Sequence, residues 1–343
     1  MSITKVAKRA GVSPSTVSRI LNKHPRVAPD TIKAVRRAMN EIGYVPSENR
    51  PGPKPGSRSA LSKKNVAFIT FGSSSRGDTP GFEQLIRGVS DAVNNRGMNL
   101  SIFHHHDPAN PPAQFRDQQM HGLLLHGAAP TPNVQAKLSG VPAVWLMANR
   151  HRPGWGDQVM PSHYDVGSKA AQYLHSRGHR LLAFLNMDRL HWAFRMYYHA
   201  FAAAAEQLGA ATIKVERTAD EGADYWFKYA PSLIETIADD FLALSPQPTG
   251  IMIADDIQTA LIQPVLQRKG LHIGPGHAEI VSVNNEKPYL FGLNPWPAVV
   301  DIRASTIGAC AVSQLLWRME NPNDAGPLMV LVPPELVPPP ENS

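Results

Sequence analysis

The sequence predicts a protein in two parts: a small N-terminal bundle of three helices, then a large α/β core of parallel sheets arranged in two lobes. Three observations support this fold class. Residues 1–42 contain three stretches with helical spacing of apolar residues, and the first two are joined by a glycine. Residues 66–302 alternate apolar runs with helical patterns, as parallel sheets covered by helices do. Positive charge is concentrated before residue 65, whereas the rest of the chain is slightly acidic.

The first 22 residues have the layout of a helix-turn-helix. Ser2 is a candidate N-cap for a first helix, whose apolar positions recur at helical spacing, and Gly11 ends that helix. Ser13 and Pro14 are typical of an N-cap followed by proline at the first helical position. The residues of the second helix that point outward are Ser15, Thr16, Ser18 and Arg19. A helix with this polar face is suited to enter a DNA major groove.

A third helix is expected after a loop, with Asp30 as its candidate N-cap and Gly43 at its end. Three helices of this size enclose only a small core. Residues 1–64 carry 14 basic and three acidic side chains, a net charge of +11, whereas the remainder carries 20 basic and 25 acidic side chains, a net charge of −5. The N-terminal part is therefore expected to bind a polyanion.

The core is expected to alternate strands with helices. The predicted strands are 66–71, 100–103, 122–125, 143–147, 181–185, 213–215, 250–254, 279–283, 298–302 and 329–332. The predicted helices include 82–97, 165–177, 192–208, 231–243, 256–269 and 304–319. A core of about 270 residues exceeds one typical sheet domain, so we expect two similar lobes. The prolines after residue 332 are expected to end regular structure.

Composition limits the environment of the protein. Cys310 is the single cysteine, which excludes an internal disulfide and cysteine-based metal clusters and fits a reducing compartment. The sequence contains no apolar run followed by a signal-peptide cleavage site, and no apolar stretch approaches the roughly 20 residues that span a bilayer. We therefore expect a cytoplasmic protein that does not enter a membrane.

The N-terminal residues resemble a known family. Residues 6–22 follow the pattern V-A-x-x-A-G-V-S-x-x-T-V-S-R-x-L-N, and V-x-x-x-T and a helix ending in G-Y-x-P come next. This pattern is similar to the DNA-binding headpiece of the lactose/galactose repressor (LacI/GalR) family of bacterial transcriptional regulators. Weaker matches to the family continue in the core, at R-G-H-R (177–180), M-I-A-D-D (252–256) and G-L-H-I (270–273).

The resemblance implies both a fold and a function. The family joins a helix-turn-helix headpiece to a periplasmic-binding-protein-like core of two doubly wound lobes, with a small-molecule effector in the cleft between them. It also implies a nucleoid-associated homodimer that binds a palindromic operator in double-stranded DNA. Carried onto this chain, the headpiece is 1–46, the linker 47–65 and the core 66–341. Lobe 1 is then expected at about 66–161 and 292–322, and lobe 2 at about 162–291 and 323–341.

The linker at residues 47–65 departs from the family pattern. Its prolines and glycines exclude a regular helix over residues 50–56, and the usual Ala-Arg-x-Leu hinge segment does not follow Pro46. Three interpretations remain open. The linker is a flexible solvated tether, or Leu61 is the minor-groove wedge of a displaced hinge, or the segment with Arg50 and Lys54 lies extended in an A·T-rich minor groove.

Candidate DNA-binding residues lie on the headpiece and the linker. Base reading is assigned to Pro14, Ser15 and Arg19, because an arginine pairs bidentately with guanine O6 and N7. The candidates for contacts with the phosphate backbone or the minor groove are Ser2, Thr4, Ser13, Thr16, Ser18, Asn22, Arg26, Arg50, Lys54 and Leu61. For Thr16 and Ser18 the alternative is an ordinary solvated helix surface.

Candidate effector-binding residues follow from the rule that ligands lie beyond the carboxyl ends of parallel strands. The residues chosen are Ser74, His106, His126, Arg150, Trp192, Arg195, Tyr197, Asp256 and Asn285. Within the family motifs, Asp255 replaces an asparagine beside Asp256, and Tyr197 aligns with an arginine, with Arg195 close by. The family's Asp-Asn before a helix reads His163-Tyr164 in this chain. The effector is expected to be a carbohydrate or a derivative, and these departures count against a common pentose or hexose.

No metal site and no cofactor are expected. His104, His105 and His106 are consecutive at a strand end, so they point to opposite sides and cannot all face one ion. The motifs of phosphate-binding loops, nucleophile elbows, zinc proteases and dinucleotide folds are absent from the sequence. The alternatives to a regulator are therefore an α/β enzyme, for which no catalytic motif is found, and a cytosolic solute-binding protein, which the basic N-terminal part does not fit.

Overall fold

The computed structural model describes residues 3–21, 27–42, 64–72, 79–105, 120–148, 154–218, 229–322 and 326–340. The chain divides into two compact units, Met1–Arg58 and Ser59–Ser343. Nearly all of the linker lies outside the described residues, as do the candidate site residues Ser2, Asn22, Arg26, Arg50, Lys54, Leu61, Ser74, His106 and Arg150. Among the helices that the structure describes, none combines the length and the apolar character needed to cross a membrane.

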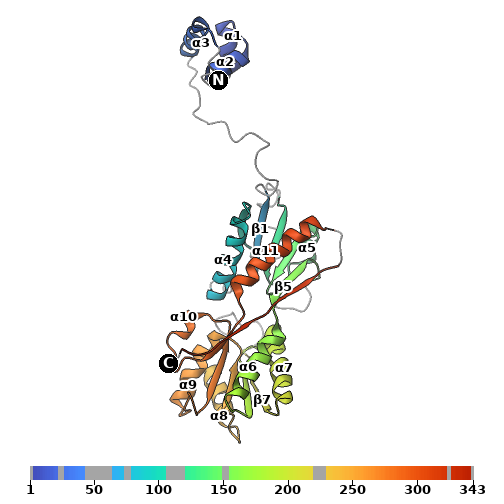
Figure 1. The fold of residues 1–343 in the computed structure, drawn as a ribbon, viewed down its shortest axis with the longest axis vertical. Coiled ribbons are helices and arrows are strands. Elements are labelled where there is room, and N and C mark those ends of the chain that lie inside the picture. Colours follow the sequence, from blue (N-terminus) through green and yellow to red (C-terminus); the bar gives the residue numbers. More distant parts are fainter. Residues whose placement is uncertain are drawn as a thin grey trace. The chain divides into compact units, whose positions relative to one another are not determined.

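The N-terminal unit contains three helices, as the sequence predicts (Figure 1). A turn joins α1 (Ile3–Ala10) to α2 (Pro14–Leu21), and Gly11 in this turn has a φ of +67°, a left-handed conformation that glycine adopts without strain. Ser13 caps α2 as expected, because its Oγ accepts a hydrogen bond from the backbone N–H of Thr16 at 3.2 Å. The buried core of the bundle consists of Val6, Ala7, Val17, Val35 and Ala38.

The third helix, α3 (Pro29–Glu41), begins earlier than expected. Ala28 is its N-cap, and Pro29 takes the first helical position, where the missing N–H costs no hydrogen bond. The prediction that Asp30 caps this helix is therefore wrong. Asp30 lies in the first turn instead, where its negative charge suits the helix dipole.

The first lobe of the core is a parallel sheet with the strand order β11-β5-β4-β3-β1-β2. Its strands are β1 (Asn65–Phe71), β2 (Asn99–His105), β3 (Gly122–Gly127), β4 (Ala143–Leu146), β5 (Asp157–Pro161) and β11 (Met329–Val332). One face is covered by α4 (Pro80–Asn94) and α11 (Ala304–Glu320), which lie side by side in Figure 1 and share a core with Phe68 and Leu124. The opposite face is covered by α5 (Pro132–Leu138), which packs on Trp145.

The second lobe is built in the same way, with the strand order β12-β10-β9-β8-β6-β7. Its strands are β6 (Leu181–Asn186), β7 (Ala211–Glu216), β8 (Gly250–Ile253), β9 (Glu279–Val283), β10 (Ala298–Asp301) and β12 (Glu335–Val337). All of them pair in parallel except β12, which pairs antiparallel with β10 at the sheet edge. The helices that cover its two faces are α6 (His163–Ser176) and α7 (Trp192–Gln207) on one side and α8 (Pro231–Leu242) and α9 (Asp256–Arg268) on the other. The short helix α10 (Lys287–Leu290) follows β9.

Strand pairing places two segments in the opposite lobe from the one expected. The chain passes between the sheets three times, after β5, β10 and β11. Residues 298–301, expected in lobe 1, form β10 and pair with β9 and β12 of lobe 2. Residues 329–332, expected in lobe 2, form β11 and pair with β5 of lobe 1. The periodicity of a strand carries no information about its distant partner, and this is why the expected lobe boundaries are wrong there.

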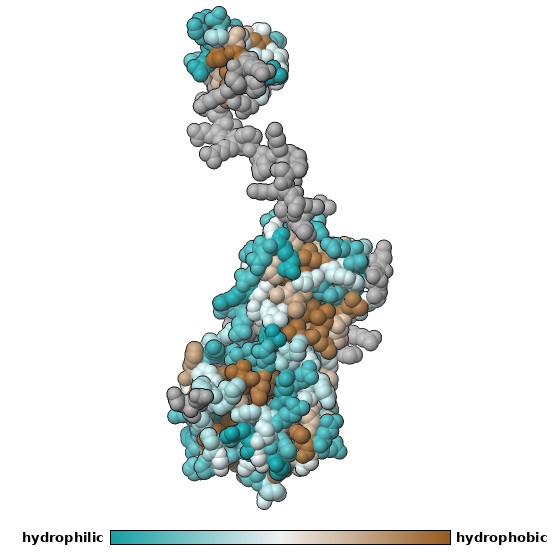
Figure 2. Space-filling view, in the orientation of Figure 1, coloured by the Kyte–Doolittle hydropathy of each residue, from teal (hydrophilic) through white to brown (hydrophobic). Residues whose placement is uncertain are grey.

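The last two strands lie at sheet edges. The expectation that regular structure ends after residue 332 is wrong, because β12 forms between Pro333-Pro334 and the three prolines 338–340 at a sheet edge, where prolines do not interrupt a ladder. On β11, Met329 and Leu331 alternate with the buried Val332 and are 41% and 51% exposed. Figure 2 shows hydrophobic surface on the visible face of lobe 1, over the region where β11 lies in Figure 1.

Candidate functional site

The outer face of α2 carries the candidate base-reading residues. Pro14, Ser15 and Arg19 are exposed on the same helix, whose inner face buries Val17. The Ser15 hydroxyl lies 2.7 Å from Ser13 Oγ, so these two side chains share a hydrogen bond at the start of the helix. The structure thus presents a guanidinium and a short polar helix start on one surface, an arrangement that can meet base edges in a major groove.

The remaining headpiece candidates are arranged around this surface. Thr4 and Ser13 are exposed, and Thr16 and Ser18 are half-buried, so these last two have less surface for a phosphate contact. Thr16 Oγ1 also lies within hydrogen-bond distance of Ser13 Oγ, at 2.9 Å. The structure therefore gives Thr16 a part in the helix start, in addition to its predicted role.

A cavity of about 170 Å³ lies between the two lobes of the core. It is situated at the carboxyl ends of several strands, as expected for a ligand site in parallel sheets. Lobe 1 contributes the lining residues Thr79, Gly81, Phe82, His126, Met147 and Ala148. Lobe 2 contributes the lining residues His163, Asp188, His191, Phe194, Tyr197, Tyr229, Asp255, Asn284 and Glu286.

Glu286 connects the two lobes at the edge of this cavity. Its Oε1 accepts a hydrogen bond at 2.8 Å from the backbone N–H of Gly81, in the first turn of α4. A helix N-terminus favours such an anionic acceptor. A Cβ at position 81 would overlap the carboxylate of Glu286, so glycine is required for this contact. The backbone N–H of Glu286 in turn donates to the carboxylate of Asp256.

Burial and mutual repulsion shift the titration of the acidic groups in the cavity wall. Burial, reinforced by the charge of Asp188, raises the pKa of Asp255 to about 6 despite hydrogen bonds from Gln258. Burial and the charge of Asp255 raise the pKa of Glu286 to about 7. Burial also raises the pKa of the Tyr197 hydroxyl. In the same wall, burial lowers the pKa of His163 to about 4, so its imidazole is neutral near pH 7.

Two of the predicted effector residues line the cavity, namely His126 of β3 and Tyr197 of α7. Trp192 lies behind the wall and contacts the ring of His163 edge-on, with 4.9 Å between ring centroids. Arg195 is exposed on α7 and does not line the cavity, because it lies on the opposite side of the helix from Phe194 and Tyr197.

For two other predicted effector residues, Asp256 and Asn285, the preceding residue lines the cavity instead. Asp256 is fully buried and is bound by the Ser282 hydroxyl and by the backbone of Glu286, so it holds α9 against β9 instead of lining the cavity. Its neighbour Asp255 lines the cavity and caps α9, accepting the N–H of Gln258 at 2.8 Å. Asn285 turns away to donate to Asp301 at 2.9 Å.

Five cavity-lining residues were not among the predicted effector residues, namely Asp188, His163, Asp255, Asn284 and Glu286. The strand-end rule points to most of these positions, since Asp188, Asp255 and Asn284 lie within two residues of the ends of β6, β8 and β9. Which of two adjacent residues faces the cavity depends on the backbone: Asn284 and Asn285 both have positive φ values, of 106° and 66°. No periodic pattern in the sequence reveals such a turn.

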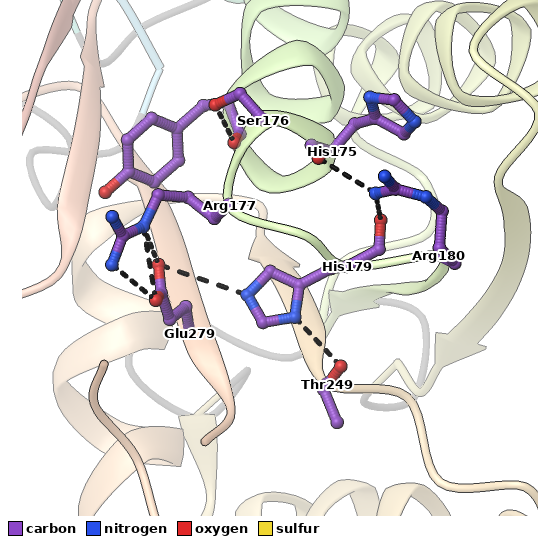
Figure 3. Close-up of polar contacts among 8 residues, drawn as sticks. His175, Ser176, Arg177, His179, Arg180, Thr249 and Glu279 are labelled. Atoms are coloured by element: carbon purple, nitrogen blue, oxygen red, sulfur yellow. Dashed lines mark hydrogen bonds and ion pairs between the residues drawn. The ribbon is translucent and has the colours of Figure 1, made fainter. Parts of the chain in front are cut away.

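The R-G-H-R segment, one of the weaker family matches, has a structural role (Figure 3). Arg177, at the end of α6, donates two hydrogen bonds at 2.9 Å to Glu279 at the start of β9. His179 lies 2.9 Å from the Thr249 hydroxyl, and Arg180 binds the carbonyl of His175 at 2.9 Å. These contacts join α6 to the amino ends of the strands, at the end of the sheet opposite the cavity.

The histidine run does not form a metal centre within the described residues. Across the described parts of the chain, no group of three His, Cys, Asp or Glu side chains is arranged to hold an ion. His105 is buried against the ring of Phe71, whereas His104 packs near Phe82, so the two neighbours point to different sides of β2. His106 lies outside the described residues.

The substitution Glu286→Gln is expected to stabilise the core by an amount that grows with pH. The raised pKa means that the native state holds this proton more tightly than the unfolded chain does. The corresponding stabilisation is fully present below the ordinary value of 4.5 and is lost as the pH rises through about 7. Glutamine keeps an acceptor for the Gly81 N–H without the charge. The free energy of unfolding of Glu286→Gln, relative to that of the native protein, should therefore increase by about 1–3 kcal/mol between about pH 5 and about pH 8.

Urea unfolding at several pH values measures this difference. Glu206→Gln is the matched control, because Glu206 is exposed on α7 in the same lobe. The difference in free energy of unfolding between Glu206→Gln and the native protein should not change over this pH range. An equally flat difference for Glu286→Gln would contradict the prediction.

Comparisons with known proteins give one family match for the N-terminal helices and another for the two-lobed core. Residues 2–47 match the family model described as bacterial regulatory proteins of the lacI family, and residues 171–338 match the periplasmic binding protein-like domain. The chain is 28% identical over 186 residues to the HTH-type transcriptional repressor PurR of Pectobacterium carotovorum subsp. carotovorum (strain PC1), and the match spans 52% of each chain. It is 24% identical over 330 residues to the uncharacterized HTH-type transcriptional regulator YkvZ of Bacillus subtilis (strain 168), covering 93% of this chain and 94% of that one.

Solved structures share the fold. The structure of the transcriptional regulator CelR–cellobiose complex covers 98% of both chains with a TM-score of 0.64 and 20% identity. The lac repressor dimer bound to operator and the anti-inducer ONPF covers 99% of this chain and 98% of that one, with a TM-score of 0.64 and 18% identity. At these identities the likeness shows the fold alone: a helical N-terminal region followed by two α/β lobes with parallel sheets.

Proposed function

This chain belongs to the LacI family of bacterial regulatory proteins, and from that premise we propose that it is a transcriptional repressor that binds a palindromic operator as a homodimer. The observation that carries this proposal is the exposed face of α2, where Pro14, Ser15 and Arg19 lie on the outer side of a capped helix. The second helix of a helix-turn-helix enters the major groove, and its first residues reach the base edges. A homodimer with two such helices suits two half-sites related by a two-fold axis.

A small molecule in the inter-lobe cavity is the proposed control on DNA binding. The cavity is lined by both lobes, and Glu286 of lobe 2 binds Gly81 of lobe 1 beside it. A ligand that binds one arrangement of the lobes more tightly than another shifts the population between them. DNA affinity changes if the two arrangements hold the headpieces differently. The proposed effector class is a carbohydrate or a derivative.

This function places the protein in the bacterial cytoplasm, on the nucleoid. The family to which the chain belongs consists of regulators and not of enzymes. A protein that only bound a solute would need neither the polar face of α2 nor the net charge of +11 over residues 1–64.

DNase footprinting of the purified protein over the DNA that flanks its own gene tests the proposed function. We expect a protected palindrome whose half-sites lie about one helical turn, or a multiple of it, apart. Crosslinking of the protein on that DNA should trap two copies per site. The absence of any protected palindrome in this region, at protein concentrations that saturate non-specific DNA, would contradict the proposal.

A further inference from the structure

We propose that the effector carries a protonated amino group, which lies between Asp255 and Glu286 in the inter-lobe cavity. This inference rests on the proposed function, because it concerns the ligand that controls DNA binding. The lining residues that the structure describes include three carboxylates, from Asp188, Asp255 and Glu286, but no lysine and no arginine. An ammonium group is the ligand chemistry that such a wall accepts with the least electrostatic cost.

The carboxylates lie close enough to repel one another. The charge of Asp188 acts on Asp255, and the charge of Asp255 acts on Glu286, in each case raising the pKa of the second group. Among the titratable groups that the structure describes around the pair, burial raises the pKa of Asp256, Tyr197 and Tyr289 and lowers the pKa of His163. His126, His191 and Tyr229 also line the cavity. Tyr197, Tyr289 and His163 carry no positive charge near neutral pH, so a ligand cation would relieve the repulsion between Asp255 and Glu286.

Aromatic side chains form part of the remaining wall, beside aliphatic and polar ones. Phe82 from lobe 1 and Phe194, Tyr197 and Tyr229 from lobe 2 line the same cavity. Aromatic faces attract cations, by about 0.5–2 kcal/mol for each well-placed pair, and they also stack on ring-shaped ligands. The combination favours a small ring compound with an amino substituent, such as an amino sugar, over an anion.

A neutral polyol fits this wall less well. Carboxylates do accept hydrogen bonds from hydroxyl groups, but a neutral ligand would bring no positive charge to Asp255 and Glu286, whose described donors, Gln258 and the Gly81 N–H, are uncharged.

The test is a thermal-shift comparison of matched ligands with the full-length protein near neutral pH. The probes are glucosamine, galactosamine and mannosamine, their parent hexoses, and their N-acetyl derivatives, which keep the nitrogen but lose its charge. We expect at least one amine to raise the melting temperature, and its parent and N-acetyl forms to raise it less at the same concentration. The proposal is overturned if a neutral form stabilises the protein as much as its amine, or if no amine stabilises it.

Variants locate the contact. Asp255→Asn should weaken binding of the best amine by about tenfold to a hundredfold, the usual range for losing a charge-assisted hydrogen bond, whereas Glu206→Gln should leave the affinity unchanged. Equal amine affinity of Asp255→Asn and the native protein would also overturn the proposal. Footprinting distinguishes failure of this proposal from failure of the proposed function. A protected operator together with no response to amines rejects the cationic effector but not the repressor function.

Discussion

Replacing Asp157 with asparagine is expected to lower the free energy of unfolding of the core by about 3–5 kcal/mol, because it removes one partner of a buried ion pair. The Asp157 side chain is 1% exposed at the start of β5, and Arg318 of α11 lies 2.7 Å from its Oδ1. Gln314 and the backbone N–H of Leu328 also donate to this carboxylate, at 2.7 and 2.9 Å. One charge thus joins a strand, a helix and the segment that leads into β11.

Urea or thermal unfolding of the full-length protein checks this prediction. Glu83→Gln is the matched control, because Glu83 forms an exposed pair with Arg87 at 2.9 Å in the same lobe, and such surface pairs contribute about 1 kcal/mol or less. A loss for Asp157→Asn no larger than that of the control would contradict the prediction.

The pH dependence of Asp157 has the opposite sign to that of Glu286. Burial alone would raise the pKa of Asp157, but the hydrogen bonds from Arg318, Leu328 and Gln314 outweigh it and lower the pKa below 3.8. Its stabilisation is therefore present above that value and is lost as the pH falls through the lowered pKa. The penalty of Asp157→Asn should accordingly shrink in strongly acidic solution.

Replacing Arg19 with alanine is expected to weaken operator binding by about 2–6 kcal/mol, because a homodimer loses one bidentate contact of about 1–3 kcal/mol in each half-site. Arg19 is exposed, so the headpiece should stay folded. Gel-shift titration on the footprinted operator measures the loss, and titration on a random duplex measures the non-specific part. The operator should lose much more affinity than the random duplex.

Arg36→Ala is the control for charge alone, since Arg36 is an exposed residue on α3. The Arg36→Ala variant should lose a similar amount of affinity for the operator and for the random duplex, and its binding to both should depend less on salt concentration. If Arg19→Ala behaved in this same way, Arg19 would be a phosphate contact, and the assignment of base reading to it would be wrong.

Local patterns account for most of the fold. The three helices of the headpiece and the alternation of the core are confirmed, because Gly11, Ser13 and the apolar spacings act within a few residues of each other. β5 was not predicted, since its first residue is a buried aspartate whose partner, Arg318, lies far along the chain. Likewise, β10 and β11 were assigned to the wrong lobes because only long-range pairing decides between the sheets.

The cavity shows the same division between local and distant information. The strand-end rule located the correct loops, and His126 and Tyr197 do line the cavity. Choosing Asp255 over Asp256 would have required knowing that Asp256, the first helical residue, turns back toward Ser282 of β9 while the N-cap Asp255 faces the cavity. The family resemblance pointed to His163, which stands where the family has an aspartate before a helix, but His163 was not among the predicted effector residues. Its place in the cavity wall depends on α6 beginning directly after β5, a strand that was not predicted.

The placement of the last two strands has a consequence for dissecting the gene. β11 completes the sheet of lobe 1 and β12 completes that of lobe 2, with only Pro333 and Pro334 between them. Neither lobe is therefore encoded by one uninterrupted fragment, and a fragment that stops before Met329 takes an edge strand from both sheets at once. Reporter fusions and recombinant chimeras should keep residues 329–337 intact, and exchange of lobes between related proteins requires several crossover points.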